Sequence, residues 1–490
     1  MTAVLFISMV ILLFAGVPIA FVLGGSSVLA LAADSGTNMS IVIQRMFSGT
    51  GSFTLLAIPF FVLAGNLMSS GGISRRLVNL CNSFLGHIPG GLAMVAVATC
   101  AFFAAISGSS AATAAAVGAI IVPEMLKHKY DRNFAAGTIA SSAELGVIIP
   151  PSIGLIQYGV AAEQSIGDLF KAGFLPGLFI CGTIMAMAHH LAKKQGFVPV
   201  EKASWAERGK AFKDAILAIL MPVIILGGIY GGIFTPTEAA AVSVVYGLFV
   251  GMVIYREVSI RDMFDILVDS AKTTGGIMLI VASASLFSFV CTKFGIADAA
   301  SNLLGSIAHN QFTFLLIVNI IFLIAGCFID ANSAMYIFIP IMLPVCKALG
   351  YDIVAFGVMA TVNLAIGQVT PPVGVNLFVA ISIKIKKGLE VTLQEISRAV
   401  VPMIAACVAV LLIVTYIPIT STFLPKALAK EGSYTGDQSS ASSDTASKEA
   451  GDGNNSFDTI ADYSDLDWPE MTWNFTCSTT ETSTWAQAGR

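Results

Sequence analysis

Residues Ser107 to Ala116 read Ser-Gly-Ser-Ser-Ala-Ala-Thr-Ala-Ala-Ala and place hydroxyls and a glycine in the middle of a long apolar run. In hydrocarbon, an unsatisfied backbone group costs several kcal/mol, so a polar break survives only where it is buried in protein or lines a cavity. The alternative is a face of small residues that lets two transmembrane helices approach closely. Taken alone, the stretch favours this packing face.

A second polar stretch changes that balance. Asp330 to Ala334 reads Asp-Ala-Asn-Ser-Ala and also interrupts an apolar run. Further along, Gly146 to Pro151 is echoed by Gly367 to Pro372, 221 residues later, and both segments end in a double proline. A duplicated unit with paired breaks at matching places indicates a transporter binding site at the interface between two repeats.

Composition identifies the class of protein. The chain has 490 residues, of which 56% are hydrophobic and only 11% charged, whereas roughly 25% are charged in ordinary soluble domains. We therefore expect an all-α polytopic membrane protein, and the duplicated breaks favour inverted structural repeats. Its 45 glycines and 18 prolines predict re-entrant helical hairpins and broken helices, which a membrane bundle tolerates where neighbouring groups satisfy the backbone. The cysteines and histidines show no spacing typical of a metal site or a disulfide framework.

Hydropathy gives a coarse course for the chain. Residues 3–33 are too long for one straight span and are expected to form a tilted or kinked helix. Residues 107–125 suit the second arm of a re-entrant hairpin. Pro150-Pro151 breaks the helix expected over 134–158, because proline removes a donor and disfavours helical geometry before it. The loop from Lys193 to Lys213 is the densest basic loop in the chain and should be cytoplasmic.

The sequence also predicts a helix cap, a second basic patch and a polar tail. Thr237-Glu238 is expected to cap the helix that follows, since Thr accepts from first-turn amides and Glu complements the helix dipole. The basic patch of the second unit is Lys384, Lys386 and Lys387. The tail from Lys426 onward is polar and should be disordered, although it holds Trp468, Trp473 and Trp485.

The paired breaks offer oxygen atoms to a small cation. A half-helix C-terminus exposes carbonyl groups, and hard cations take oxygen ligands. Sodium is the expected ion. Its candidate ligands in the first unit are Ser107, Ser109, Ser110 and Gly146, and those in the second unit are Asp330, Asn332, Ser333, Gly367 and Thr370.

Two acidic residues leave alternatives open. Asp330 is a carboxylate placed in a break, and an intramembrane ionisable residue is by default a functional candidate. It could instead serve as a helix N-cap. Glu144, near the first double proline, could be a proton or ion ligand, or a charge that faces a water-filled cavity.

An organic anion would have to be held without a deep guanidinium, because no arginine lies inside an apolar run. Positive helix N-termini attract carboxylates without a buried formal charge. Side-chain amides and bound sodium would supply the remaining contacts. The candidate substrate-binding residues are Ser109, Pro151, Asn332, Asn363, Pro372 and Asn376.

Several motifs in order resemble one transporter family. They are Ile58 to Gly65 (Ile-Pro-Phe-Phe-Val-Leu-Ala-Gly), Ser107 to Ala114, Pro150-Pro151-Ser152, and Gly231 to Ala240 (Gly-Gly-Ile-Phe-Thr-Pro-Thr-Glu-Ala-Ala). At these residues the chain resembles the large, DctM-like membrane subunit (M subunit) of tripartite ATP-independent periplasmic (TRAP) transporters, over roughly residues 1–425. The polar tail is outside the family pattern.

The resemblance implies sodium-coupled secondary active uptake of an organic acid anion, such as a C4-dicarboxylate, sialic acid or a similar carboxylate, across the bacterial inner membrane. It implies an elevator in which a transport domain containing both breaks moves past a scaffold domain. The implied partners are a small four-helix membrane subunit and a periplasmic substrate-binding protein that delivers the anion; nucleic acid is not among them.

The resemblance and the duplicated units together predict six segments in the chain. We expect scaffold helices and the start of repeat 1 in 1–70, repeat 1 with its hairpin and broken helix in 71–192, the cytoplasmic basic loop in 193–214, scaffold helices in 215–262, repeat 2 with its hairpin, broken helix and last span in 263–425, and the polar tail in 426–490.

Two rivals belong to other functional classes. An intramembrane serine protease would use Ser109 as its nucleophile, but no histidine lies within an apolar segment at that depth, and a serine without a base is a weak nucleophile. A passive anion channel would also conduct carboxylates, but the paired breaks fit a gated binding site better. We therefore expect a transporter and not an enzyme.

Overall fold

The computed structural model describes residues 1–34, 36–195, 201–296, 299, 310–383 and 391–428. The regular elements of these residues are all helices. Nine of the described helical segments are long and apolar enough to cross a membrane, and the bent pair formed by residues 132–148 and 153–162 could add a tenth. The expected all-α polytopic architecture is therefore confirmed.

The N-terminal apolar run forms two helices and not one kinked helix. α1 (Thr2–Phe14) and α2 (Ile19–Ala32) flank the break at Gly16, whose φ is +74°. The two helices pack against each other, and a Cβ on Gly25 would lie 3.5 Å from the Leu12 side chain. The left-handed glycine and Pro18 turn the chain back on itself, which hydropathy alone does not reveal.

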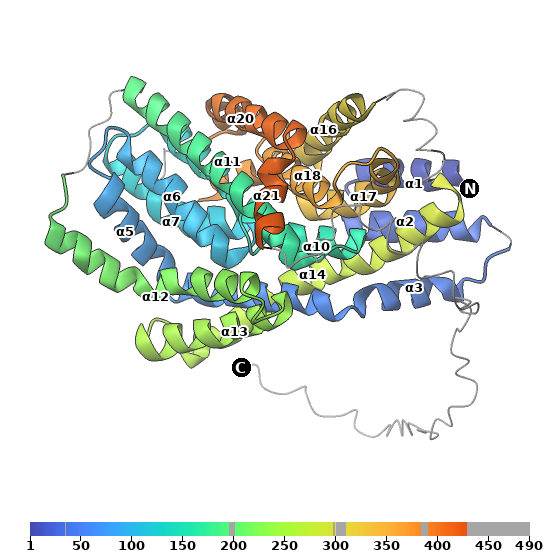
Figure 1. The fold of residues 1–490 in the computed structure, drawn as a ribbon, viewed down its shortest axis with the longest axis horizontal. Coiled ribbons are helices and arrows are strands. Elements are labelled where there is room, and N and C mark those ends of the chain that lie inside the picture. The colour runs from blue at the N-terminus through green and yellow to red at the C-terminus, as the bar shows by residue number, and fades with distance from the viewer. Residues whose placement is uncertain (35, 196–200, 297–298, 300–309, 384–390, 429–490) are drawn as a thin grey trace, which may run out of the picture. The chain divides into compact units, whose positions relative to one another are not determined.

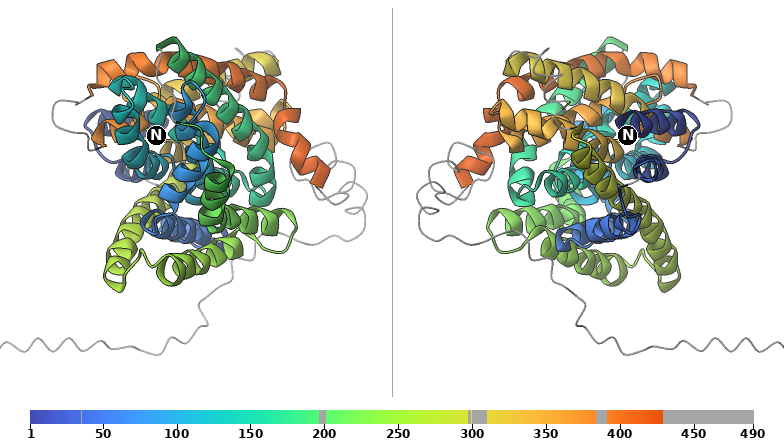
Figure 2. Two further views of the ribbon diagram at one scale, coloured as in Figure 1. Left: turned by 90° about the vertical axis from the view of Figure 1, so that its left-hand side faces the viewer. Right: turned by 90° about the vertical axis from the view of Figure 1, so that its right-hand side faces the viewer.

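One layer of the molecule contains the green and yellow-green helices, which lie along its lower edge in Figures 1 and 2. α14 packs against α2, α3 and α4, and α13 packs against α4. The bounds of the helices in this layer are α3 (Ser40–Thr50), the short turn η1 (Phe53–Leu56), α4 (Ala57–Ser70), α12 (Trp205–Tyr230), α13 (Pro236–Leu248), the π-helical turn η2 (Phe249–Ile254) and α14 (Ile260–Lys293).

The first repeated unit contains a hairpin followed by a broken helix. α6 and α7 pack together as the hairpin, and α8, α9 and α10 follow it. The amphipathic α5 packs against α6 and α12, and at 13 residues it is too short to span a bilayer. The bounds are α5 (Ile73–Leu85), α6 (Gly91–Ser107), α7 (Ser110–Lys127), α8 (Arg132–Ala143), α9 (Leu145–Ile148), α10 (Ile153–Ala162) and α11 (Ile166–Gln195).

The second unit repeats this order. Its bounds are α16 (Gln311–Phe328), α17 (Ala331–Ala348), α18 (Ile353–Gly367), α19 (Val375–Ser382), α20 (Leu393–Tyr416) and α21 (Ile419–Leu428). The contacts between the units are reciprocal: α7 packs against α19, and the equivalent α17 packs against α10. Such an exchange is what a two-fold relation between the units produces. In Figure 1, α6 and α7 lie toward one end of the bundle, and α17 lies toward the other.

Helix ends extend beyond the apolar runs that define them in the sequence. The segment 193–214, expected as a loop, is largely helical, because α11 continues to Gln195 and α12 begins at Trp205. The segment boundary expected between residues 262 and 263 falls inside α14, which has 34 residues. Charged side chains on these end turns lower the hydropathy without ending the helix.

Side-chain caps explain why three of these helices start where they do. Ser204 with Glu207, Thr235 with Glu238, and Ser259 with Asp262 each form a reciprocal capping box. The hydroxyl that caps α13 therefore belongs to Thr235 and not to Thr237, which is buried in the first turn. Thr235 precedes Pro236, whose ring suits the first helical position.

Some expectations fall outside the described residues. The patch of Lys384, Lys386 and Lys387 does so, as does the tail beyond Leu428 with its tryptophans. At the start of the expected tail, Lys426 still belongs to α21.

Candidate functional site

The two polar breaks meet at one cavity of about 370 Å³. The tip of the first hairpin supplies Ser107 to Ala112, and the start of α17 supplies Asp330 and Asn332. The remaining walls come from the flanks of the double prolines (Val147, Ile153, Gln368, Val375), from α4 (Val62, Gly65, Asn66) and from α14 (Thr273, Ile277). We call this space the central cavity.

The tip of the first hairpin is fixed by a glycine. α6 ends at Ser107, and Gly108 adopts a left-handed φ of +63°. A Cβ at Gly108 would lie 2.9 Å from the Pro151 carbonyl oxygen. The backbone N–H of Ile153 donates to the Gly108 carbonyl over 3.2 Å. The hairpin tip and the first double proline are therefore held as one unit, which is Pro151's part in the site.

Three oxygen atoms gather just below this tip. The Thr113 hydroxyl donates to the Ser109 carbonyl over 2.8 Å, and the Ser107 hydroxyl lies 3.0 Å from that of Thr113. Gly146 of α9 faces the group closely, because a Cβ there would lie 2.5 Å from the Ser109 carbonyl oxygen and 2.7 Å from the Thr113 hydroxyl. Ser107, Ser109 and Gly146 thus come together as expected. Thr113 joins them, although sequence reasoning did not select it.

The tip of the second hairpin shows that Asp330 is an N-cap and a cavity residue at once. Its carboxylate accepts a hydrogen bond from the Ser333 backbone N–H over 3.2 Å and another from the Ser333 hydroxyl. The side-chain oxygen of Asn332 is buried, and no described protein group donates to it. Asp330 and Asn332 therefore bring a carboxylate and a buried, unpaired amide oxygen to the same wall of the cavity.

One buried hydrogen bond joins the two units across the cavity. The Ser110 hydroxyl donates to the Gln368 side-chain oxygen over 2.7 Å, and both residues are at most 5% exposed. The Gln368 carbonyl in turn accepts from the Asn376 backbone N–H over 3.0 Å, which closes the second double-proline turn. Gln368 was missed in the sequence, although it stands beside Gly367 in the repeated motif as a polar side chain in an apolar run.

Other candidates lie away from the wall of the central cavity. Asn363 donates to the side-chain and backbone oxygens of Asn319 over 2.8 and 2.9 Å, so it ties α18 to α16. The Thr370 hydroxyl donates to the Ile366 carbonyl, and Pro372 is exposed. Gly367 lets α18 approach α16, because a Cβ there would lie 2.6 Å from the Gly326 Cα.

Two buried polar side chains remain without a use at the central cavity. Asn376 is fully buried at the start of α19. Neither its side-chain oxygen nor its side-chain nitrogen has a hydrogen-bond partner among the described residues. Glu144 is 1% exposed and lies beside the Cys407 thiol. Neither residue contributes to the wall of the central cavity.

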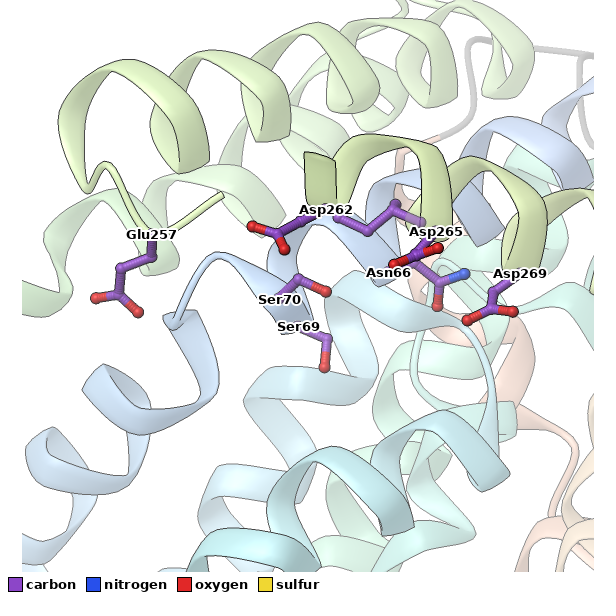
Figure 3. Close-up of a pocket in the computed structure, with 8 residues that line it drawn as sticks. Asn66, Ser69, Ser70, Glu257, Asp262, Asp265 and Asp269 are labelled. Atoms are coloured by element: carbon purple, nitrogen blue, oxygen red, sulfur yellow. The ribbon is translucent and has the colours of Figure 1, made fainter. Parts of the chain in front are cut away.

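One face of α14 lines this cavity and two others in succession. Asp262, Asp265 and Asp269 line a cavity of about 470 Å³, Thr273 and Ile277 line the central cavity, and residues 281–293 line a third of about 780 Å³. Figure 3 shows the first of these, where the three aspartates of α14 face Ser69, Ser70 and Asn66. Asn66 lines both the acidic and the central cavity and donates to the Ser270 hydroxyl over 2.8 Å.

The site contains no catalytic pair for hydrolysis. Ser109 accepts a hydrogen bond from the Ala112 backbone as the N-cap of α7, and no histidine lines the described central cavity. Within the described part of the chain, no cluster of His, Cys, Asp and Glu could hold a metal ion. Paired hairpins and broken helices around one shared cavity are the architecture of a helical secondary transporter.

Comparison with known proteins identifies the family. The model for the "Tripartite ATP-independent periplasmic transporter, DctM component" matches residues 6–420. The chain belongs to this family, the large permease subunits of TRAP transporters, and it is a multi-pass membrane transport protein of the bacterial inner membrane and not an enzyme.

Three relatives illustrate the range of the family. The chain is 41% identical to the isethionate TRAP transporter permease protein DctMQ of Oleidesulfovibrio alaskensis over 86% of its own length and 66% of that protein's. It is 38% identical to the C4-dicarboxylate large permease DctM of Rhodobacter capsulatus, with 87% and 99% covered. It is also 38% identical to the sialic acid large permease SiaM of Vibrio cholerae, with 85% and 96% covered.

A solved structure supports the fold. The YdaH transporter of Alcanivorax borkumensis superposes with a TM-score of 0.57 over 78% of this chain and 88% of that one, at 13% sequence identity. At this identity the likeness concerns the fold alone.

Proposed function

We propose that this chain couples the entry of sodium to the uptake of an organic acid anion, and that both bind at the central cavity. The observation that carries the proposal is the meeting of the two breaks, since Ser110 and Gln368 from different units are joined by a hydrogen bond at its wall. Three of the proteins similar to this one are named for isethionate, C4-dicarboxylates and sialic acid, which are all organic acids or their anions.

The oxygen atoms at the hairpin tips suit sodium. The group formed by Ser107, Ser109 and Thr113 combines two hydroxyls with a backbone carbonyl beside Gly146. On the other side, the Asn332 oxygen is buried without a donor. Hard cations prefer such oxygen ligands, and an oxygen without a donor is stabilised when a cation arrives.

The helix ends around the cavity suit a carboxylate. α7 begins at Ser110 and α17 begins at Ala331, so the N-termini of both helices lie at the wall. Free backbone N–H groups and the helix dipole favour an anion there. No lysine or arginine is among the residues that line the described cavity, so bound sodium would supply the compensating charge. This arrangement makes anion binding depend on sodium.

The layers of the fold support the proposal of an elevator. The first hairpin packs against α19 and the second against α10, whereas α14 packs mainly against α2, α3 and α4 and less extensively against α17. We infer that the first group is the transport domain and the second the scaffold. A small four-helix membrane subunit and a periplasmic binding protein complete the transporter, as the tripartite family description suggests.

Reconstitution tests this function. The chain and its small partner subunit are placed in liposomes, the binding protein is added outside, and uptake of succinate, isethionate and sialic acid is compared under an inward sodium gradient and an equal potassium gradient. The proposal predicts that one acid accumulates above its external concentration only with sodium. Equilibration without accumulation, at equal rates in the two salts, would instead establish a passive channel.

A further inference from the structure

The third cavity along α14 lies between the two layers of the fold and measures about 780 Å³, within the roughly 300–1,000 Å³ typical of ligand pockets. α3 and α14 form one side, and α10 and α17 form the other. We call it the outer chamber. Three charged residues line the chamber, namely Arg45, Glu163 and Lys293. Its hydroxyl groups belong to Tyr336, Ser48, Ser52, Ser285, Ser288 and Thr292.

Arg45 brings a positive charge to this chamber without a carboxylate of its own. Its guanidinium lies over the Phe289 ring, 4.5 Å from the ring centroid. None of the ion pairs formed by the described residues includes Arg45. Stacking on an aromatic face leaves the N–H groups at the guanidinium edge available, and that edge matches a carboxylate in a bidentate manner.

Lys293, the second cation of the chamber, is already neutralised. Its ammonium group lies 2.9 Å from the Asp34 carboxylate. The hydroxyl of Thr37 and the ammonium of Lys293 both lower the pKa of the Asp34 carboxyl, so this carboxyl stays ionised at neutral pH. Glu163 is the carboxylate that lines the chamber; it is the C-cap residue that follows α10, on the side opposite Arg45. Arg45 is therefore the free cation of the described chamber wall.

Tyr336 supplies an independent sign of a ligand. The residue is only 5% exposed, it lines the outer chamber, and no described group accepts from or donates to its hydroxyl. A buried hydroxyl without a partner costs free energy. The hydroxyl oxygen itself is covered, so the Tyr336 side chain must turn toward the chamber before an anion there can accept its hydrogen bond and remove that cost.

The chamber also stands at the appropriate end of α14. Positions 262, 266, 269, 273, 277, 281, 284, 288 and 292 recur every three or four residues, so they share one helical face. This face is acidic at its start and basic at its end. If the Lys193 to Lys213 segment is cytoplasmic, then α12, α13 and α14 cross in turn and bring Lys293 to the periplasmic side.

We propose that the outer chamber is a second anion-binding site, in which Arg45 and Tyr336 hold a carboxylate or sulfonate before it enters the central cavity. The anion's identity rests on the proposed function. The site itself is tested by binding and does not require transport.

The test measures protection of a cysteine placed in the chamber. Thr292 is exposed, and the described native cysteines are buried, so Thr292→Cys is made with Cys477→Ser. The chain is purified with its small partner subunit, without the binding protein. An impermeant thiol reagent is then applied with increasing succinate, isethionate or sialic acid. We expect at least one acid to slow labelling, and Arg45→Gln to raise its half-protecting concentration about tenfold by removing a charge-assisted hydrogen bond.

Matched variants make this result specific. Tyr336→Phe should raise the half-protecting concentration about two- to fivefold, because the neutral hydroxyl donates a weaker hydrogen bond to the anion than the charged guanidinium does. Arg45→Lys keeps the charge but loses the bidentate edge, so it should raise the half-protecting concentration by less than Arg45→Gln does. Glu163→Gln removes the facing negative charge and should lower the half-protecting concentration. Gly146→Ala displaces the first hairpin tip, which lines the central cavity and not the outer chamber, and it should leave protection unchanged.

Several results would overturn the proposal. They are an absence of protection by all three acids, an unchanged half-protecting concentration in Arg45→Gln, an increase in Glu163→Gln as large as that in Arg45→Gln, or a loss of protection in Gly146→Ala. The two proposals fail separately. Arg45-dependent protection without sodium-driven uptake would leave the chamber and reject the transport function, and the reverse would reject the chamber alone.

Discussion

Gly146 gives the sharpest single perturbation of the central cavity. A Cβ added at this residue would lie 2.5 Å from the Ser109 carbonyl oxygen and 2.7 Å from the Thr113 hydroxyl. Real Cβ contacts are essentially never shorter than 3.0 Å, so Gly146→Ala must push the hairpin tip away from α9. Overpacking of this kind costs about 1–3 kcal/mol. If the strain falls on the oxygen group, sodium affinity drops about five- to 150-fold.

The assay is the sodium dependence of uptake in proteoliposomes, with acid and binding protein held at saturation. We expect Gly146→Ala to raise the half-saturating sodium concentration while the amount of protein in the membrane stays normal. Gly182→Ala is the matched control, because a Cβ at Gly182 in α11 meets nothing within 4 Å. An unchanged half-saturating sodium concentration in a well-folded Gly146→Ala protein would refute the placing of sodium at this tip.

Three further predictions follow from the same site. Asp330→Ala should abolish or strongly reduce sodium-driven uptake with the protein still inserted, and Asp330→Asn should do the same although asparagine can still cap α17; wild-type uptake in Asp330→Asn would show that only the cap matters. Ser110→Ala and Gln368→Leu should be coupled by about 1 kcal/mol in sodium half-saturation, and additive effects would mean that their bond does not shape the site. Deleting the residues after Lys430 should leave transport intact, because the tail has no repeat partner; lost activity at normal membrane abundance would contradict this.

The sequence was sufficient to predict the elements that depend on local chemistry. Polar breaks in apolar runs predicted both hairpin tips, and the double prolines predicted the broken helices, because unsatisfied backbone in hydrocarbon and missing N–H donors have strong local effects. The repeat spacing then predicted that Ser107 to Ser110 and Asp330 would share a site, and they line one cavity.

Features that depend on tertiary contacts could not be predicted in the same way. Asn363 is a polar residue at depth, which favours a binding role, but Asn319 from α16 holds it, and nothing in the sequence indicates that pairing. Gln368 has no local signal of its role, because its partner, Ser110, lies 258 positions away. Hydropathy cannot distinguish the hairpin of α1 and α2 from one kinked helix, because a kink and a reversal have the same hydropathy. It also underestimates helix length where charged residues extend α11, α12 and α14.

Two inverted units that meet at one cavity must direct the ends of their hairpins toward opposite faces of the membrane. Lys127 and Lys347 lie at the ends of α7 and α17, and both are exposed. Each is replaced by cysteine in a Cys477→Ser background, and an impermeant thiol reagent is applied to one face of the membrane at a time. If the two units are inverted, the two cysteines will be labelled from opposite faces. Labelling of both from the same face would mean that the units are parallel and would contradict the elevator.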